Sequence, residues 1–489
     1  MQSALVRLEA KPLVLFVLLL VFALAIRAIT FGNPILGVDD QFYLLVGDQM
    51  VHHGAIPYVT IFDRKPVGLF LIYAAIRELG GDGFVEYKLV ACLFVASGGL
   101  LIYRAARPIS SALGAFVAAL IYMLWLGFME GEGGQSPVFY NPLMIGAALL
   151  TWASVEKASR RRALGALAML CVGLALQIKY TVVFEGIFFG LVLMWGQWRD
   201  AKSLGRTLGA GAFWAGIALL PTALAMSYYW HIGALHEFLF ANFYSVFGRA
   251  YLHQSYTLLL AGSAAIVLAP LIVLALVAVR EGKLTPRWVF YFGWLAVSIF
   301  ALVAFGSFLD KHYALPVIAP VSLLVAPYFG RDEARAHFAA RFIAIALLLN
   351  QLSLNATAYL LGGRAEAQTL ATAAQPKHGC LYVASDYPAL YMMTHSCLLT
   401  KWIFPAHLRD RKETSLSALG VDPVAELGRV LAQRPETIVD TRSDSDEDNP
   451  ASRRLLYGVL AQDYHAVQRV QLHYGNFVTV YRRNDAPPG

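Results

Sequence analysis

Long apolar segments alternate with short polar connections over most of the chain. Residues 13–25 and 187–194 are continuously apolar and show no two-residue alternation. Such runs are typical of membrane-spanning helices and not of barrel strands. With about 20 apolar residues per span, the pattern predicts about eleven transmembrane helices. Their expected centres lie near Leu20, Val95, Leu120, Ala148, Ala168, Phe189, Leu219, Val267, Val297, Leu323 and Ile345.

Residues 67–79 depart from this pattern. The segment is apolar but short, ends in Arg77 and Glu78, and is followed by a glycine-rich turn. It is too short to cross a bilayer, so it predicts an amphipathic helix at the membrane interface.

The composition becomes polar after about residue 361. Residues 380–385 and 477–482 have strand character, and residues 423–433 and 451–461 have helical character. The sequence therefore predicts an α-helical polytopic membrane domain (1–361) followed by a small α/β domain (362–489).

Composition and charge agree with a membrane protein. Hydrophobic residues make up 58% of the chain and charged residues 15%, which excludes an ordinary soluble domain. The net charge of +7 comes from basic clusters in every second loop, and this positive-inside pattern places the N-terminus in the cytoplasm and the C-terminal domain outside it. Scattered clusters of this kind do not favour nucleic-acid binding. They are Arg104/Arg107, Lys157/Arg160–Arg162, Arg199/Lys202/Arg206, Arg280/Lys283/Arg287 and Arg331/Arg335/Arg341.

Two other features leave alternatives open. Cys380 and Cys397 lie in the C-terminal domain, whose compartment permits a disulfide, but the sequence does not decide whether one forms. The acidic run 442–449 fits a solvated loop better than a metal site.

Charge is concentrated in the first loop, residues 32–66. It carries Asp39, Asp40, Asp63, Arg64 and Lys65 among apolar and aromatic residues. An ordinary solvated loop is one explanation. The alternative is that the loop packs on the membrane domain, which would desolvate the Asp39–Asp40 pair and raise one of its pKa values. A carboxylate in that state is suited to take a proton from an attacking hydroxyl.

The motifs of this loop resemble those in the first periplasmic loop of GT-C glycosyltransferases. The similar branch contains bacterial relatives of protein O-mannosyltransferases and the aminoarabinose transferases of lipid A. The resemblance extends to the many spans and the C-terminal domain, but only the loop motif is specific. Its parts are Asp39-Asp40-x-x-Tyr43, Gly54-x-x-Pro57-Tyr58 and Asp63-Arg-Lys-Pro66.

The resemblance implies an enzyme of the bacterial inner membrane that transfers a sugar from a polyprenyl phosphate, generally with inversion. The acceptor would be a cell-envelope lipid or polysaccharide on the periplasmic face, with a protein hydroxyl less favoured. By position in the motif, Asp39 is the expected general base and Asp40 its support or a metal ligand. Lys65 is expected to bind the donor phosphate, where a cation offsets the charge on the leaving group.

This chain departs from the family pattern at a few positions. Asp40, Phe62 and Val67 replace Glu, Trp and Pro, and the shorter Asp40 changes the reach of that carboxylate. Arg64, which we also assign to the donor phosphate, stands where some relatives carry a metal-binding Glu. No cofactor is therefore assigned, and a divalent cation stays an open alternative.

Further candidates lie elsewhere in the chain. Lys311, His312 and Tyr313 precede a proline-rich span and are candidate donor-phosphate ligands, although snorkelling side chains explain them equally well. The candidate wall of the acceptor cavity is assigned to Tyr58, Asp63, His236, Glu237 and Arg249. The composition around the last three favours an interfacial aromatic belt.

Two other functions compete with a transferase. A lipid or solute transporter or flippase would carry internal repeats and matching broken spans, and no clear repeat is present. A noncatalytic scaffold leaves the charged first loop unexplained. The short loops expected on the cytoplasmic side leave no room for a nucleotide-sugar domain, which favours a lipid-linked donor.

Overall fold

The computed structural model describes residue 9 and residues 11–249, 254–282, 284–304, 310–411, 413, 415–441, 448–471 and 477–486. The chain forms two compact units. Unit 1 comprises Met1–Ile29, Lys88–Ala225 and His253–Leu354, and unit 2 comprises Thr30–Tyr87, Met226–Leu252 and Asn355–Gly489.

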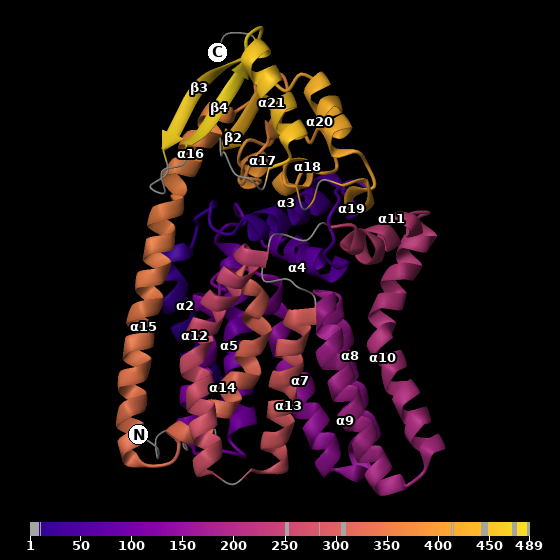
Figure 1. Cartoon of the computed structure of the whole chain (residues 1–489), viewed down its shortest axis with the longest axis vertical. Helices are drawn as coiled ribbons and strands as arrows, with labels where there is room; N and C mark the ends of the chain where they lie inside the picture. The colour runs from indigo at the N-terminus through magenta and orange to yellow at the C-terminus, as the bar shows by residue number, and fades with distance from the viewer. Residues whose placement is uncertain are drawn as a thin grey trace. The chain divides into compact units, whose positions relative to one another are not determined.

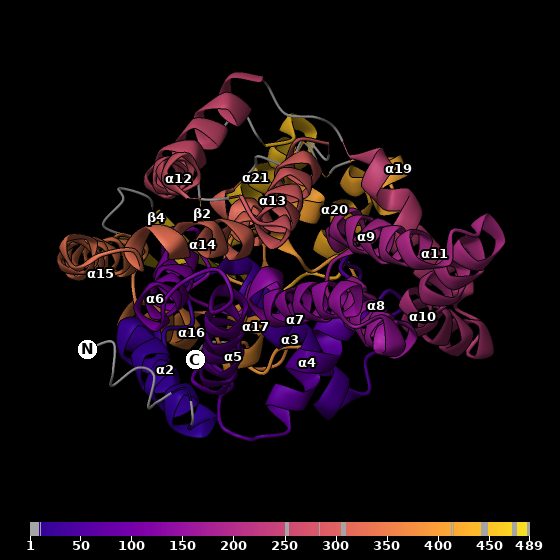
Figure 2. The ribbon, with the colours of Figure 1, turned by 90° about the horizontal axis from the view of Figure 1, so that it is seen from below.

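Unit 1 is a helical bundle in which long helices run side by side (Figure 1), most of them seen end-on in Figure 2. Helix α14 lies at its centre and packs against α6, α12 and α13. The helices are α2 (Pro12–Arg27), α5 (Glu86–Ala106), α6 (Ala112–Phe128), α7 (Ser136–Glu156), α8 (Arg161–Leu176), α9 (Val183–Ala201), α10 (Leu204–His231), α12 (Gln254–Glu281), α13 (Pro286–Ala304), α14 (Leu315–Phe329) and α15 (Glu333–Leu361).

These helices have the lengths and surfaces of membrane spans. Each of the expected span centres lies within one of them, and among the described residues nine helices are long and apolar enough to cross a bilayer. Helices α6 and α8, with 17 and 16 residues, are not among these nine, whereas α2 and α14 are included because adjoining 3-10 turns extend them to Pro12–Thr30 and Lys311–Phe329. Large apolar side chains face outward, including Leu13 at 73% exposure and Ile266 at 74%. Apolar helices with apolar outer faces make this a multi-pass membrane protein.

Ion pairs link the polar ends of the unit 1 helices. Arg161 contacts Asp200 at 2.7 Å, and Arg287 contacts Glu156 at 2.6 Å. All four residues belong to or border the basic clusters that were assigned to the cytoplasmic side, and that orientation stays a prediction.

Unit 2 contains the first loop, whose helix α3 (Val38–His53) packs against α4 (Val67–Arg77), the helix that follows the loop. Gly47 of α3 makes their close contact possible, since a Cβ there would lie 2.6 Å from the backbone of Tyr73. The expected helix after residue 66 is therefore present as α4, with Leu69 and Phe70 buried. Its place at the membrane interface stays a prediction.

The C-terminal part of unit 2 contains a four-stranded sheet of order β1-β2-β4-β3. Strands β1 and β2 are parallel, and β4 is antiparallel to both β2 and β3. Helix α16 packs against β2, β3 and β4, and α21 packs against β3 and α20. The elements are α11 (Leu235–Leu239), α16 (Arg364–Ala374), β1 (Leu381–Val383), α17 (Ala389–Met393), α18 (Pro405–Arg409), α19 (Leu416–Leu419), α20 (Pro423–Ala432), β2 (Thr437–Thr441), α21 (Pro450–Asp463), β3 (Tyr464–Gln471) and β4 (Phe477–Arg483).

This confirms the expected small α/β region, including β1, β4, α20 and α21. Local capping explains where the helices begin: Asp422 accepts a hydrogen bond from the Ala425 amide ahead of Pro423, and Asn449 does the same for α21. The domain boundary at residue 362 stays a prediction. Most of the acidic run 442–449 lies outside the described residues.

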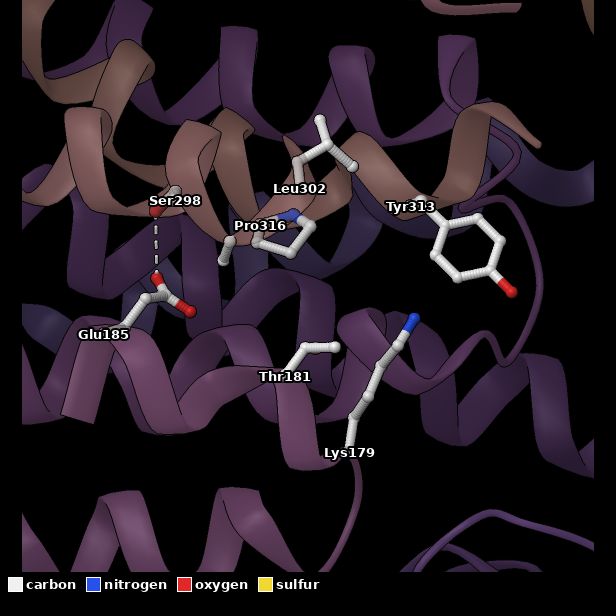
Figure 3. Close-up of a pocket in the computed structure, with 8 residues that line it drawn as sticks. Lys179, Thr181, Glu185, Ser298, Leu302, Tyr313 and Pro316 are labelled. Carbon is white, nitrogen blue, oxygen red and sulfur yellow. Dashed lines mark hydrogen bonds between the residues drawn. The ribbon is translucent and has the colours of Figure 1, made fainter. Parts of the chain in front are cut away.

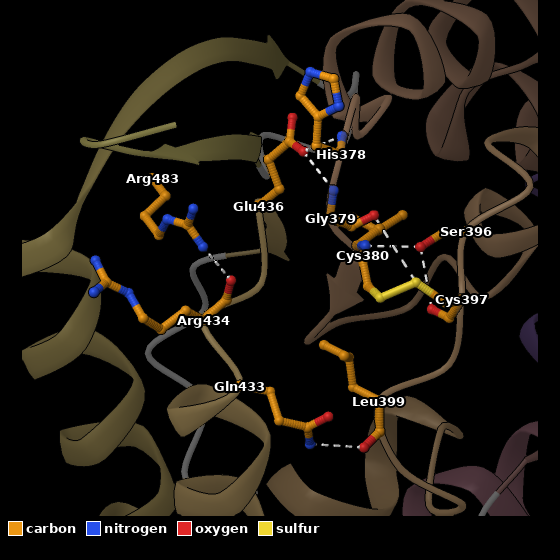
Figure 4. Close-up of a disulfide and its surroundings, with 11 residues drawn as sticks. His378, Gly379, Cys380, Ser396, Cys397, Leu399, Gln433, Arg434, Glu436 and Arg483 are labelled. Atoms are coloured by element: carbon orange, nitrogen blue, oxygen red, sulfur yellow. Dashed lines mark hydrogen bonds between the residues drawn. A yellow bond between two sulfur atoms is a disulfide. The ribbon is translucent and has the colours of Figure 1, made fainter. Parts of the chain in front are cut away.

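A disulfide joins Cys380 and Cys397, which decides the alternative that the sequence left open. Figure 4 shows Ser396 beside it. The Ser396 Oγ accepts a hydrogen bond from the Leu381 amide at 2.7 Å. Beside it, the Glu436 carboxylate accepts hydrogen bonds from the amides of His378 and Gly379, both at 2.8 Å. The disulfide therefore connects the start of β1 to the loop after α17.

Candidate functional site

Asp39, Tyr43 and Lys65 meet at the start of α3. Asp39 and Tyr43 are one helical turn apart, so both side chains lie on the same face. The Tyr43 hydroxyl donates to Asp39 Oδ2 at 3.1 Å, and Lys65 Nζ lies 3.8 Å from the same oxygen. Lys65 Nζ also lies 5.3 Å from the centre of the Tyr43 ring. We call these three residues the Asp39 cluster.

The Asp39 cluster is partly open to solvent. The side chains of Asp39 and Lys65 are 22% and 24% exposed, whereas Asp40 is only 3% exposed. Neighbouring positions on a helix point about 100° apart, so Asp40 faces the interior. The raised pKa predicted for one member of the Asp39–Asp40 pair stays a prediction.

Asp63 supports the same cluster through the backbone. Its Oδ1 accepts a hydrogen bond from the Lys65 amide at 2.6 Å, which fixes the turn that carries Lys65. Burial raises the pKa of Asp63, and the charge of Asp39 raises it further, although the Lys65 ammonium and amide oppose this shift. Asp63 thus positions Lys65 and adds a second carboxyl group beside Asp39.

Tyr58 is buried, at 1% exposure, and it anchors the loop. Its hydroxyl donates to the Lys65 carbonyl at 2.7 Å, and its ring packs against Tyr229 and Phe238. The residue has a φ of 71°, a left-handed conformation that only tertiary contacts of this kind sustain in a tyrosine. Its contacts are those of a structural anchor, and its assignment to an acceptor wall stays a prediction.

Arg64 is next to Lys65 in the chain, but its side chain contacts other residues. Its guanidinium pairs with Glu413, as does that of Arg249. It also donates to the Ala418 carbonyl at 2.8 Å and to Ser245 Oγ at 3.2 Å. We call Arg64, Arg249 and Glu413 the Glu413 cluster.

Burial and charge act strongly in the Glu413 cluster. Burial acts to raise the pKa of Glu413, but the two guanidinium groups outweigh it and hold the pKa at about 2. His407 lies next to these groups with its ring 5.3 Å from that of Phe62. Burial lowers the pKa of His407 to about 3, and the charge of Arg64 contributes in the same direction.

A backbone hydrogen bond also connects the first loop to the C-terminal residues. The Phe62 amide donates to the Lys401 carbonyl at 2.8 Å. Together with the Glu413 cluster, this bond holds both sides of the turn at Asp63.

Lys311, His312 and Tyr313 belong to unit 1. His312 is 8% exposed, stacks on Tyr313 at 4.6 Å and lies 3.5 Å from Glu130 through Nδ1. Figure 3 shows Lys179 extending toward Tyr313, and its Nζ lies 4.5 Å from the ring centre. Both residues line a pocket with Glu185. The assignment of Lys311, His312 and Tyr313 to the donor phosphate stays a prediction. Lys179 is an additional candidate for the same role.

His236 and Glu237 lie on the short helix α11 in unit 2. His236 is exposed and stacks on Phe240 at 6.4 Å. The hydrogen bond and ion pair described for Asp39 come from Tyr43 and Lys65, and the acceptor role of His236 and Glu237 stays a prediction.

The described residues do not favour a metal at this site. Among them, no group of three or more His, Cys, Asp or Glu side chains is arranged to hold a metal ion. Asp39 already faces the Lys65 ammonium. The Glu413 carboxylate is neutralised by the guanidinium groups of Arg64 and Arg249. No step is therefore assigned to a divalent cation, which stays an open alternative.

Sequence reasoning missed Glu413, His407 and Lys179. Glu413 is 349 residues from Arg64, and nothing in its local sequence marks it as a partner. Lys179 lies at the end of a span, and a basic residue in that place was the one signal that could have found it.

Comparisons with known proteins support the fold. Residues 64–223 match the family model described as dolichyl-phosphate-mannose-protein mannosyltransferase. No curated protein sequence matches the chain. The structure of ArnT from Cupriavidus metallidurans in the apo state is similar, with a TM-score of 0.62 and 15% identity over 96% of this chain and 98% of that chain.

Two more solved structures are similar to this chain. ArnT from the same organism bound to undecaprenyl phosphate gives a TM-score of 0.58 and 15% identity over 97% of this chain and 99% of that chain. A variant of the arabinofuranosyltransferase AftD from Mycobacteria gives 0.50 and 14% identity over 97% of this chain and 41% of that chain. The fold is therefore that of the GT-C glycosyltransferases.

Proposed function

We propose that this chain, a GT-C glycosyltransferase by fold, transfers a sugar from a polyprenyl-phosphate donor to a hydroxyl group of a cell-envelope acceptor. The Asp39 cluster is the observation that carries the proposal. Its carboxylate and ammonium are close, partly exposed and in contact with Tyr43, on the loop whose motif resembles that of GT-C glycosyltransferases. The undecaprenyl phosphate bound by the similar ArnT structure supports a donor of this class.

In this mechanism Asp39 is the general base. The acceptor oxygen attacks the anomeric carbon while the bond between that carbon and the phosphate oxygen breaks. The hydroxyl proton passes to Asp39, and polyprenyl phosphate leaves with one additional negative charge. Attack opposite the leaving group inverts the anomeric configuration.

Lys65 has two roles that follow each other. In the free enzyme its ammonium keeps Asp39 ionised, because an opposite charge at this distance favours the carboxylate. When the donor phosphate binds, Lys65 moves to it and offsets the charge that develops on the leaving group. That change also releases Asp39 to accept the proton.

The location is proposed on independent grounds. A disulfide in the C-terminal region fits an oxidising compartment, which favours the periplasmic side of a bacterial inner membrane for unit 2. The basic clusters then face the cytoplasm, as the positive-inside rule requires. An envelope lipid or polysaccharide is the proposed acceptor, ahead of a protein hydroxyl.

The test is sugar transfer by the purified protein in nanodiscs, with a panel of synthetic polyprenyl-phosphate sugars and an envelope-lipid extract. Asp39→Asn is expected to lower polyprenyl-phosphate release by about 10²–10⁴-fold, the range for a general base. Asp485→Asn, which alters an exposed ion pair with Arg434, is the matched control and retains full activity. Equal rates for wild type and Asp39→Asn would overturn the assigned role.

A further inference from the structure

A second cavity lies in unit 2, away from the Asp39 cluster. Its volume is about 260 Å³. Its lining includes Asp48 of α3, Arg77 of α4, Asp82 of the following turn, and Arg364 and Gln368 of α16. Met392 and Met393 at the end of α17 provide an apolar side.

The cavity is separated from Asp39 by the geometry of α3. Asp48 follows Asp39 by nine residues, so the two side chains point in nearly opposite directions, about 13 Å apart along the helix axis. Asp48 Oδ1 is engaged by Arg77 Nε at 2.9 Å, which turns it further from the Asp39 cluster. The reacting atoms of the proposed transfer therefore do not occupy this cavity.

Its charges are balanced in pairs. Arg77 pairs with Asp48, and Arg364 Nη2 contacts Asp82 Oδ2 at 3.1 Å. Arg77 also donates to the Gly81 carbonyl at 3.1 Å. Each guanidinium thus faces one carboxylate, and the remaining ionisable side chain of the lining is His395, so the paired arginines do not favour a phosphate or another anion.

Backbone shape keeps both guanidinium groups at the cavity wall. Gly32 and Gly83 have φ values of +68° and +85°, and a Cβ on them would lie 3.1 Å from Arg364 Nη1 and 2.9 Å from Arg77 Nη1. Glycine meets both requirements, the left-handed backbone and the space. Because Gly32 and Gly83 have no side chains, the hydrogen-bond donors and acceptors of the cavity wall are left uncovered.

We propose that this cavity binds a neutral sugar residue of the acceptor, remote from the residue that receives the transferred sugar. Hydroxyl groups both donate and accept hydrogen bonds, so they fit an alternation of guanidinium, carboxylate and the Gln368 amide. The methionines suit the apolar C–H face of a pyranose ring, because thioether side chains adapt to irregular surfaces. A mainly apolar pocket with a few convergent polar groups is a typical ligand site.

This inference rests on the proposed function, but its first test does not need turnover. Saturation-transfer NMR would be recorded on the full chain in nanodiscs with methyl glycosides of glucose, mannose and galactose, and with inorganic phosphate as a separate probe. At least one glycoside is expected to bind at millimolar concentration. Arg364→Ala is expected to weaken that binding about tenfold, the loss of one hydrogen bond to a charged group.

Matched variants separate binding from folding. Arg434→Ala removes an arginine of similar exposure, 59% against 66%, and is expected to bind the glycoside as wild type does. Gln368→Ala alters an exposed side chain of the cavity and provides a second weakened variant. Asp39→Asn retains glycoside binding even though it loses transfer, so failure of this inference and failure of the proposed function are distinguishable.

In the transfer assay, Arg364→Ala is expected to raise the acceptor KM about tenfold and to leave kcat unchanged, which a role in folding alone would not do. Absence of binding by every glycoside would overturn the inference. Equal glycoside binding by Arg364→Ala and wild type would also overturn it. So would a result in which inorganic phosphate, and no glycoside, binds in a way that depends on Arg364.

Discussion

Arg64 and Lys65 are neighbours in the first loop, yet they meet carboxylates in opposite ways. Lys65 faces Asp39 across 3.8 Å with both side chains partly exposed. Arg64 faces Glu413 in direct contact, with that carboxylate 5% exposed and shared with Arg249. A loose, accessible pair can exchange its partner for a substrate, whereas a closed one mainly holds the chain. In the proposed mechanism these adjacent basic residues therefore differ: Lys65 takes part in transfer, while Arg64, whose assignment to the donor phosphate stays a prediction, holds the loop.

The largest expected effect is on stability, at Glu413. Glu413→Ala leaves the guanidinium groups of Arg64 and Arg249, whose side chains are 12% and 29% exposed, without their shared carboxylate, which costs on the order of 3 kcal/mol. Thermal unfolding of the purified protein in nanodiscs measures the loss. Asp485→Asn, at an exposed pair, is expected to leave the free energy of unfolding close to that of wild type.

A triple variant sharpens this prediction. Arg64→Met with Arg249→Met and Glu413→Leu removes all three charges together, so it is expected to regain much of the lost stability. If the triple variant is less stable than Glu413→Ala alone, the cluster does not act as a closed charge set.

The next effect is on activity, at Lys65. Lys65→Ala is expected to lower transfer by about 10²–10³-fold, the range for one group that stabilises developing negative charge. Its Tm is expected to stay near that of wild type, because the 3.8 Å pair contributes little. Steady-state kinetics and thermal unfolding measure the two. Lys377→Ala, at an exposed lysine, is the control, and a large loss of stability in Lys65→Ala would contradict the comparison.

A pH dependence is expected from His407. Its pKa is about 3 in the native state against 6.5 unperturbed, so the unfolded chain binds a proton that native His407 does not. Stability therefore falls as the pH decreases from 6.5 toward 3. Glu413, with a pKa of about 2 against 4.5, adds a loss only below 4.5.

His407→Phe isolates the histidine contribution. Between pH 6.5 and 4.5 the variant is expected to lose Tm less steeply than wild type, since only His407 of the two titrates there. Parallel slopes in wild type and variant would show that His407 is not held neutral.

The smallest effect is expected at Tyr43. Tyr43→Phe removes the hydrogen bond to Asp39 and keeps the ring beside Lys65. Loss of one hydrogen bond of about 1 kcal/mol lowers transfer about fivefold. The kcat of the variant measures this, and a loss as large as that of Asp39→Asn would assign Tyr43 a direct role.

The sequence predicted what depends on local patterns. Apolar runs located the spans, and a motif of near neighbours located Asp39 and Lys65, because a helical turn brings Asp39 beside Tyr43. The sequence could not predict the partners of Arg64, because Glu413 lies 349 residues away along the chain. Strand β3 was missed because its burial alternates weakly and most of its side chains are exposed.

The support of the first loop has a consequence for how the protein is made. Phe62 and Arg64 emerge early from the ribosome, but Lys401, Glu413 and Ala418 follow some 340–350 residues later. At typical synthesis rates this delay is on the order of 20–70 s. A nascent chain therefore inserts its first helices long before its loop is clamped, and a chain that stops short of Glu413 would reach the membrane without a finished reaction centre.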